Sequence, residues 1–323
     1  MKPGISRYTG WLLVVMLGGC GGTAMDSSSN AGPVPGAQET VPAASSEFLS
    51  DNEHWRQQRA EDLRKPDGWM HLAGLYWVRS KRHLIGSAPG NGMRLPFGPE
   101  HVGVLAEERP GQFFFLPEND LKSTHNGEPV TGRIRIYSDG DPEPSVIGFD
   151  DGKGVMRLIR RGNRYALRVW HADAGAQASS VPLEYWPADP GWRIRGRFIA
   201  SPAGQTLPVT NIIGAVDDLP NPGVVEFQRG GKTYRLETIG TAGEQLSIVF
   251  ADLTSGQGSY VTGRYVDLDP PDSEGNVVLD FNRAYSPPAA FTRYSTSLLA
   301  PASNRMDIAV TAGEKYQRPS SPQ

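Results

Sequence analysis

Cysteine is almost absent from the sequence: among 323 residues, only Cys20 carries a thiol. A disulfide within the chain is therefore excluded, and so is a zinc site built from several cysteines. Disulfides stabilise many exported proteins. This chain can form none internally, so we expect its hydrophobic core alone to stabilise the fold.

An excess of positive charge is also missing. Lysine and arginine together number 32 against 35 aspartates and glutamates, which gives a formal net charge of -3. Proteins that bind nucleic acids usually carry a basic stripe or patch. The sequence therefore predicts no nucleic-acid partner.

Motifs for the common catalytic and cofactor sites are lacking as well. The six histidines are scattered, and no two of them have the HxH or HExxH spacing of a metal site. No GxSxG motif marks a nucleophilic serine, and no glycine-rich loop carries a Walker lysine. We therefore predict neither a metal nor a cofactor.

The N-terminus resembles a bacterial lipoprotein signal peptide. Lys2 and Arg7 precede the apolar run WLLVVML at residues 11–17, which is too short to span a bilayer as a stable helix. The run ends in LGGC at residues 17–20, which is similar to the lipobox. We predict a signal peptide over residues 1–20 and acylation of Cys20 with fatty acids such as palmitate. The alternative is an ordinary signal peptide in which Cys20 is incidental.

Acylation would attach the protein to a membrane, because two or three acyl chains anchor stably. By analogy with lipoprotein sorting, Gly21 rather than aspartate after the cysteine favours the outer membrane, with the protein facing the periplasm. Residues 21–46 hold almost no large apolar side chain and cannot bury enough surface to fold. We predict a flexible linker there.

One helix and many strands are predicted after the linker. Ser50 with Glu53 forms a candidate capping box, and helical spacing continues to Leu63 before Pro66 ends the run. Short alternating or apolar segments follow between glycine- and proline-rich turns, which is typical of β-sandwiches and barrels. The predicted strands are 113–116, 133–137, 165–170, 192–198, 224–228, 233–239, 247–250, 260–268, 277–281 and 306–310. The turn RGGK at residues 229–232 predicts a hairpin between the strands 224–228 and 233–239.

The turn-rich stretch at residues 187–191 predicts a boundary between two domains. Residues 47–186 would hold the helix and a β-sandwich, and residues 187–323 a second sandwich or barrel-like domain. The segments at 84–87, 100–103 and 126–127 are spaced somewhat as in forkhead-associated (FHA) sandwiches. The resemblance implies such a fold for the first domain. Ser87 stands where that family has a phosphate-binding arginine, so phosphate recognition is not implied.

A more specific set of motifs lies in the C-terminal third. It comprises DLTSG at 252–256, TGRY at 262–265, VLDFNRAYSPP at 278–288, Asn304 and AGEK at 312–315. Together with Trp55-Arg56 and GWMHLAGL at 68–75, these motifs resemble the domain of unknown function 1684 family. That family has no agreed function, so the resemblance implies no activity. The family pattern has cysteines where this chain has Ala289 and Ser297, which removes any thiol role.

Polar residues of these motifs are the candidate binding site. They are Asp252, Arg264, Tyr265, Asp280, Asn282, Arg283, Tyr285, Asn304 and Glu314. We expect segments 260–268 and 277–281 to form an antiparallel hairpin that places Arg264 opposite Asp280. Such a cluster is either a pocket for an anionic ligand or a buried ion-pair network. Glu314 and Lys315 are either catalytic or, as we expect, the end of a strand in solvent.

Two functions remain open on this evidence. The first is a cell-envelope lipoprotein that binds a small molecule or an envelope protein without catalysis. The second is an envelope hydrolase that uses Asp280 or Asp252 as acid or base while Arg264 holds an anionic substrate. Aromatic residues such as Trp69 either line a sugar or peptide groove or pack in the core. The absence of a nucleophile–base pair from the motifs favours binding.

Overall fold

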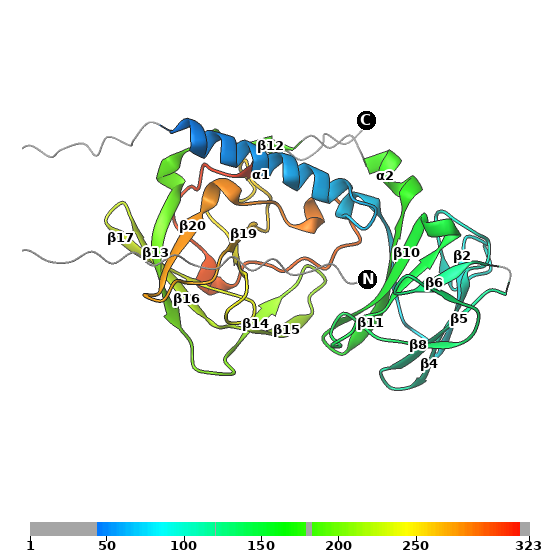
Figure 1. Ribbon diagram of the computed structural model, residues 1–323. Coiled ribbons are helices and arrows are strands. Elements are labelled where there is room, and N and C mark those ends of the chain that lie inside the picture. The colour runs from blue at the N-terminus through cyan, green and yellow to red at the C-terminus, as the bar shows by residue number, and fades with distance from the viewer. Residues whose placement is uncertain (1–43, 120, 179–182, 317–323) are drawn as a thin grey trace, which may run out of the picture. The chain divides into compact units, whose positions relative to one another are not determined.

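The computed structural model describes residues 44–119, 121–178 and 183–316 (Figure 1). The predicted signal peptide, Cys20 and most of the predicted linker lie outside these ranges. Within them, no helix is both long enough and apolar enough to cross a membrane.

Helix α1 (Ser46–Arg64) is the long helix expected near the N-terminus. The Ser45 hydroxyl caps it by accepting a hydrogen bond from the Phe48 amide at 3.1 Å. The predicted capping box at Ser50 is wrong, because the chain is already helical one turn earlier, where Phe48 is buried. The helix ends before Pro66, as predicted, since the residue preceding a proline disfavours the helical conformation.

Two sheets packed face to face form a β-sandwich. The first has the order β1 (Leu72–Trp77), β11 (Arg164–His171), β10 (Gly154–Arg161), β9 (Val146–Phe149), β6 (Ser123–His125) and β7 (Glu128–Val130). The second has the order β3 (Met93–Arg94), β2 (Arg82–Gly86), β4 (Gly103–Arg109), β5 (Gln112–Pro117) and β8 (Ile134–Ile136). Alternating apolar residues of both sheets, among them Phe113, Phe115, Phe149 and Leu167, share one core. The sandwich predicted from the sequence is therefore present.

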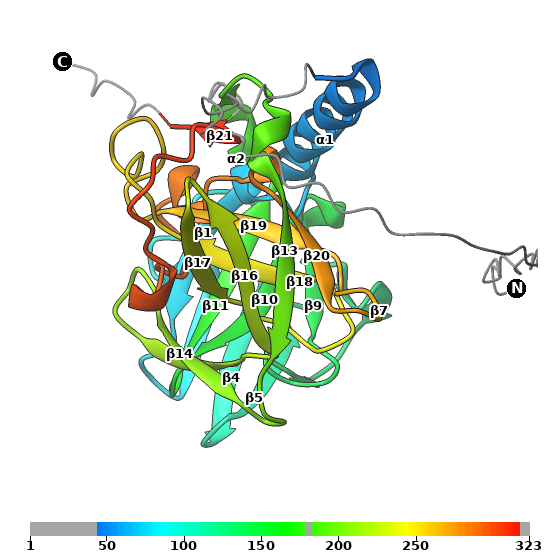
Figure 2. The same cartoon turned by 90° about the vertical axis from the view of Figure 1, so that its left-hand side faces the viewer.

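The following strands build a second set of sheets. The largest has the order β17 (Lys232–Glu237), β16 (Gly223–Arg229), β13 (Arg193–Ala200) and β20 (Asn276–Asp280), seen side by side in Figure 2. Three pairs accompany it: β18 (Leu246–Phe250) with β19 (Arg264–Leu268), β14 (Thr206–Thr210) with β15 (Val216–Pro220), and β12 (Glu184–Tyr185) with β21 (Glu314–Lys315). The chain is thus mostly β, as expected.

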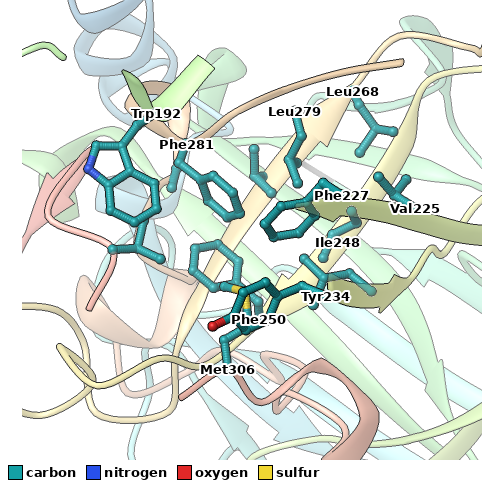
Figure 3. Packing of buried hydrophobic residues seen from close by; sticks show 14 of the residues in the cluster. Trp192, Val225, Phe227, Tyr234, Ile248, Phe250, Leu268, Leu279, Phe281 and Met306 are labelled. Carbon is teal, nitrogen blue, oxygen red and sulfur yellow. The ribbon is translucent and has the colours of Figure 1, made fainter. Parts of the chain in front are cut away.

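A second core lies among these sheets. Phe227, Phe250 and Phe281 pack edge to face around its centre, and Trp192 contacts Phe281 in the same manner (Figure 3). The hairpin predicted around residues 229–232 is confirmed, since Arg229 pairs with Lys232 between β16 and β17. The predicted strand at 306–310 is wrong: Met306 and Val310 are buried, but the segment is irregular.

The predicted hairpin between residues 260–268 and 277–281 is also wrong. β19 pairs with β18, whereas β20 pairs with β13. Val266 on β19 and Leu279 on β20 are both fully buried in the same core. The two strands therefore belong to separate sheets that contribute to one core, rather than to a single ladder.

Short helices connect these strands. They are α2 (Ala172–Ala178) and the 3₁₀ turns η1 (Trp69–His71), η2 (Asp150–Gly152), η3 (Pro190–Trp192), η4 (Phe281–Arg283), η5 (Pro288–Ala290) and η6 (Ala302–Asn304). Helix α1 contacts η1, which precedes the sandwich, and η4, which follows β20. The domain boundary at 187–191 stays a prediction.

Candidate functional site

Arg264 lies at the start of β19 and is fully buried, with 0% of its surface exposed. One guanidinium nitrogen, Nη2, donates to the Val310 carbonyl at 2.8 Å and to Asp252 Oδ2 at 3.3 Å. The other, Nη1, donates to the Ala312 carbonyl. Burial lowers the pKa of Arg264, and the Asp252 carboxylate opposes that shift. Arg264 therefore joins β19 to the C-terminal segment and has no exposed surface to offer a ligand.

Asp252 completes this network. Its Oδ2 accepts the Val310 amide hydrogen at 2.6 Å, and its Oδ1 accepts the Thr254 hydroxyl at 2.9 Å. The Thr254 hydroxyl also lies 2.9 Å from the Ser259 hydroxyl. The DLTSG and TGRY motifs thus form a buried polar network with the chain just before AGEK.

Asp280 is not the partner of Arg264, contrary to the sequence-based expectation. Its Oδ1 instead accepts hydrogen bonds from the Asn282 amide at 3.0 Å and from Asn282 Nδ2 at 2.9 Å, which caps η4. Asn282 also exchanges two hydrogen bonds with the Asp189 backbone. Arg193 and Arg283 approach Asp280 Oδ2 only at 4.0 and 3.9 Å. The reason is topological, because β20 adjoins β13 and not β19.

Glu314 is buried, with 1% exposure, so the expectation that it lies in solvent is wrong. Its Oε1 pairs with Arg59 Nε of helix α1 at 2.9 Å, and its Oε2 accepts the Ser286 amide hydrogen at 2.7 Å. The Arg59 guanidinium also lies 4.6 Å from the centre of the Tyr285 ring. This cluster holds α1 against the C-terminal motifs.

Asn304 is another structural member of the candidate set. Its Nδ2 donates to the carbonyls of Glu237 and Val249, both at 2.9 Å, and its Oδ1 accepts the Glu237 amide hydrogen at 2.7 Å. Its amide group therefore links the backbones of β17 and β18.

Tyr265 and Tyr285 line open cavities among the described residues. The Tyr265 hydroxyl donates to the Leu298 carbonyl at 3.1 Å, and the Tyr285 hydroxyl donates to Asp267 Oδ2 at 3.0 Å. Burial raises the pKa of both phenols, and the nearby Asp267 carboxylate raises that of Tyr285 further. Both are therefore neutral hydrogen-bond donors at ordinary pH and not bases.

The two cavities form a groove, which we define by the residues common to both: Trp69, Tyr265 and Pro288. The larger cavity has a volume of about 710 Å³ and the smaller about 380 Å³. The larger one is also lined by Asp139, Arg160, Arg161, Arg168, Asp217, Asp218 and Thr296. The smaller one is also lined by Trp55, Gln58, Arg59, Asp62, Asp267 and Tyr285.

Residues far apart in the sequence meet at the larger cavity. The tip of the β10–β11 hairpin reaches the β14–β15 hairpin, where the Gly162 amide donates to Asp217 Oδ1 at 2.6 Å (Figure 1). Arg168 on β11 donates to the Thr296 hydroxyl at 3.1 Å, and Arg161 on β10 donates to the same hydroxyl at 2.9 Å.

Sequence reasoning missed Arg168. The signal was present, because an arginine interrupts the otherwise apolar run ALRVW at residues 166–170. A charged side chain in a strand that reads as buried needs either a partner or a function. Among the described residues, no group of three or more His, Cys, Asp or Glu side chains is arranged to hold a metal ion.

The C-terminal motifs lie in a segment that matches a known family. Residues 181–315 match the family DUF1684, described as a protein of unknown function. The match supports the resemblance drawn from the motifs over this segment. Trp55-Arg56 lies outside the matched segment, but Arg56 Nη2 donates to the Trp186 carbonyl inside it at 2.9 Å.

Ala289 and Ser297, where the resemblance implies cysteines in the family, are neighbours in space. The Ser297 hydroxyl accepts a hydrogen bond from the Ala289 amide at 2.9 Å. Ser297 also lies 3.1 Å from the Ser295 hydroxyl. A hydroxyl contact therefore holds together the two segments that carry Ala289 and Ser297.

Among solved structures, the solution structure of an uncharacterized protein of Haloarcula marismortui is 29% identical, with a TM-score of 0.36. The match covers 43% of this chain and 79% of that protein. The N-terminal FHA domain from EssC, a component of the bacterial type VII secretion apparatus, is 14% identical, with a TM-score of 0.24. That match covers 31% of this chain and 46% of the EssC chain. No curated protein matches the chain.

Proposed function

We propose that this protein is a cell-envelope lipoprotein that binds a small ligand in the groove at Trp69, Tyr265 and Pro288, without catalysing a reaction. Cys20 would carry the lipid that anchors it, at the outer membrane facing the periplasm. The observation that carries the proposal is the groove itself, because concave sites with aromatic walls and a few polar groups are where small ligands bind.

The polar motif residues support binding over hydrolysis. Arg264 is fully enclosed, and its guanidinium is occupied by Asp252 and by backbone carbonyls. An arginine that holds a substrate needs a face open to that substrate. Both carboxylate oxygens of Asp252 accept hydrogen bonds from neighbouring donors, and Asp280 Oδ1 accepts two from Asn282. No observation therefore favours the hydrolase that these residues suggested.

A defined panel of soluble compounds tests the proposal. It would contain neutral disaccharides, dipeptides, monocarboxylates and sugar phosphates, each measured by equilibrium dialysis with the full-length protein. At least one class should bind, and Trp69→Ala should weaken that binding at least tenfold. Trp77→Ala is the matched control, since Trp77 is half-buried at the end of β1 and does not line the groove. Absence of any binder, or binding that is indifferent to Trp69, would refute the proposal.

A further inference from the structure

Arg168 lies near the middle of β11 with 7% of its surface exposed, and it lines the larger cavity of the groove. Among the described residues, its one hydrogen bond to another side chain goes from Nη2 to the Thr296 hydroxyl at 3.1 Å. Its Nε is buried and has no hydrogen-bond partner among the described residues. No described carboxylate lies within ion-pair distance of Arg168, so its charge is not compensated.

Neighbouring arginines raise the energetic cost of leaving Arg168 without an acidic partner. Arg157 stands directly opposite it across the β10–β11 ladder, and like charges in that position repel. Arg157 is itself paired with Asp67 at 3.0 Å, and Arg161 with Asp139 at 2.7 Å. The two flanking arginines therefore have acidic partners, whereas the most buried of the three has none.

Burying the charged side chain of Arg168 in this way is energetically unfavourable. Burial, together with the charges of Arg161 and Arg157, lowers the pKa of Arg168 to about 10, while the Asp139 carboxylate opposes the shift. At neutral pH the side chain is still protonated. An uncompensated buried charge is unfavourable, and apolar residues of similar volume usually serve a fold better. Residues that oppose stability in this way cluster at functional sites.

Aromatic rings hold the guanidinium in place. Its carbon lies 5.0 Å from the centre of the Trp69 ring and 5.9 Å from that of Trp170. Arginine commonly stacks on aromatic faces and still offers its edge to a planar acid. Trp69 therefore connects Arg168 to the residues that the two cavities share.

We propose that Arg168 is the anion-binding residue of the groove, and that the ligand presents to it a single carboxylate or phosphate group. The inference rests on the proposed function and names the chemical class of its ligand. The acid group supplies the missing charge, and the planar guanidinium suits two parallel hydrogen bonds to it.

Acidic residues of the same cavity limit the charge of the ligand. Asp139 is neutralised by Arg161, but Asp217 and Asp218 on β15 have no ion pair among the described residues. A ligand with several acid groups would meet these carboxylates. A ligand with one acid group and several hydroxyl groups fits this cavity better, because hydroxyls can donate hydrogen bonds to Asp217 and Asp218.

The test uses inorganic phosphate and acetate as separate probes on the full-length protein in detergent, with chloride at equal ionic strength as the reference. At least one probe should raise the wild-type melting midpoint by several degrees. Arg168→Met should abolish the rise and, without an anion, melt no lower than the wild type. Arg164→Met is the matched control, because Arg164 is an exposed arginine on the same strand and outside the cavity; it should keep the rise.

Other outcomes separate the inference from the function on which it rests. An undiminished anion-dependent rise in Arg168→Met would overturn the inference. So would a variant that melts well below the wild type in chloride, since Arg168 would then stabilise the fold. An Arg168→Met protein that does not fold would overturn it for the same reason. Arg168→Lys keeps the charge without the planar fork, so it should keep a smaller rise, and a full-sized rise would contradict the forked contact. Trp69-dependent binding of neutral compounds alone would remove this inference and leave the proposed function standing.

Discussion

At the scale of single residues, two buried arginines of this chain differ in what surrounds them. Arg264 has Asp252 and several backbone carbonyls within reach, whereas Arg168 has one hydroxyl and two indole rings. From the sequence both read as an arginine in a strand. The groups that surround each arginine come from segments distant along the chain, so the sequence did not indicate them.

Arg264→Ala tests the structural network at this scale. Removing one partner of a buried pair leaves the other charge stranded, so the free energy of unfolding should fall by about 3–5 kcal/mol. Denaturant unfolding measures the change. Arg235→Ala is the control, because the Arg235–Glu226 pair is largely exposed and is expected to contribute under about 1 kcal/mol. Equal effects of the two substitutions would show that the Arg264 network is not structural.

At the scale of elements, helix α1 is attached to the C-terminal β structure by a few specific contacts. Arg59 pairs with Glu314, and Arg56 reaches the Trp186 carbonyl. The sequence correctly predicted that this segment is a helix and that it ends before Pro66. No residue pattern within the helix indicates which part of the fold it contacts. Its docking matters for the site, since Trp55 and Arg59 of α1 line the smaller cavity.

Arg59→Ala should loosen this attachment. Glu314 would be left buried without its cation, which costs on the order of 3 kcal/mol. Hydrogen exchange should then show faster exchange of the α1 amides than in the wild type. Arg64→Ala, which removes an exposed arginine bonded only to the Ala60 carbonyl of its own helix, should leave that exchange unchanged. Unaltered protection of α1 in Arg59→Ala would argue against the Arg59–Glu314 anchor.

The segment around η5 allows a second test at this scale. Ala289 and Ser297 are in contact through a hydrogen bond of 2.9 Å. In a Cys20→Ser background, the double variant Ala289→Cys/Ser297→Cys should form a disulfide under oxidising conditions and gain about 2 kcal/mol for so short a loop. Thiol titration and melting, each with and without reductant, measure both effects. Two free thiols in the oxidised sample would show that the two side chains do not face each other.

At the scale of the whole molecule, the described residues begin at residue 44, near the end of the linker predicted over residues 21–46. Deleting residues 21–44 should leave the melting midpoint unchanged, because their composition offers too little apolar surface to pack. Extending the deletion through residue 46 removes the Ser45 cap and should cost about 1 kcal/mol. Calorimetry of both variants distinguishes a linker from a docked segment, and a drop of several degrees in the shorter deletion would contradict the prediction.

Membrane attachment is the other prediction for the whole molecule. Cys20→Ser removes the only thiol of the chain and should abolish incorporation of labelled palmitate. The protein should then leave the membrane fraction after cell lysis. Cys20→Ser protein that still takes up the label, or wild-type protein that never does, would rule out the proposed anchor.

The sequence by itself determined the class of fold and several local elements. Alternating apolar residues indicated strands, helical spacing indicated α1, and the glycine pair at 230–231 indicated the β16–β17 hairpin. These signals are local, since a few consecutive residues decide which face of an element is apolar. The DUF1684 motifs were equally visible in the sequence.

Only the tertiary structure decided which polar residues meet. Residues 264 and 280 looked like a cross-strand pair, yet their strands lie in different sheets. Glu314 looked exposed, yet Arg59 from a helix 255 positions away covers it. Arg168 and Tyr265 likewise reach one cavity from separate strands. A sequence pattern records which face of a strand is buried but not which distant segment covers it, because the packing of the whole core makes that choice.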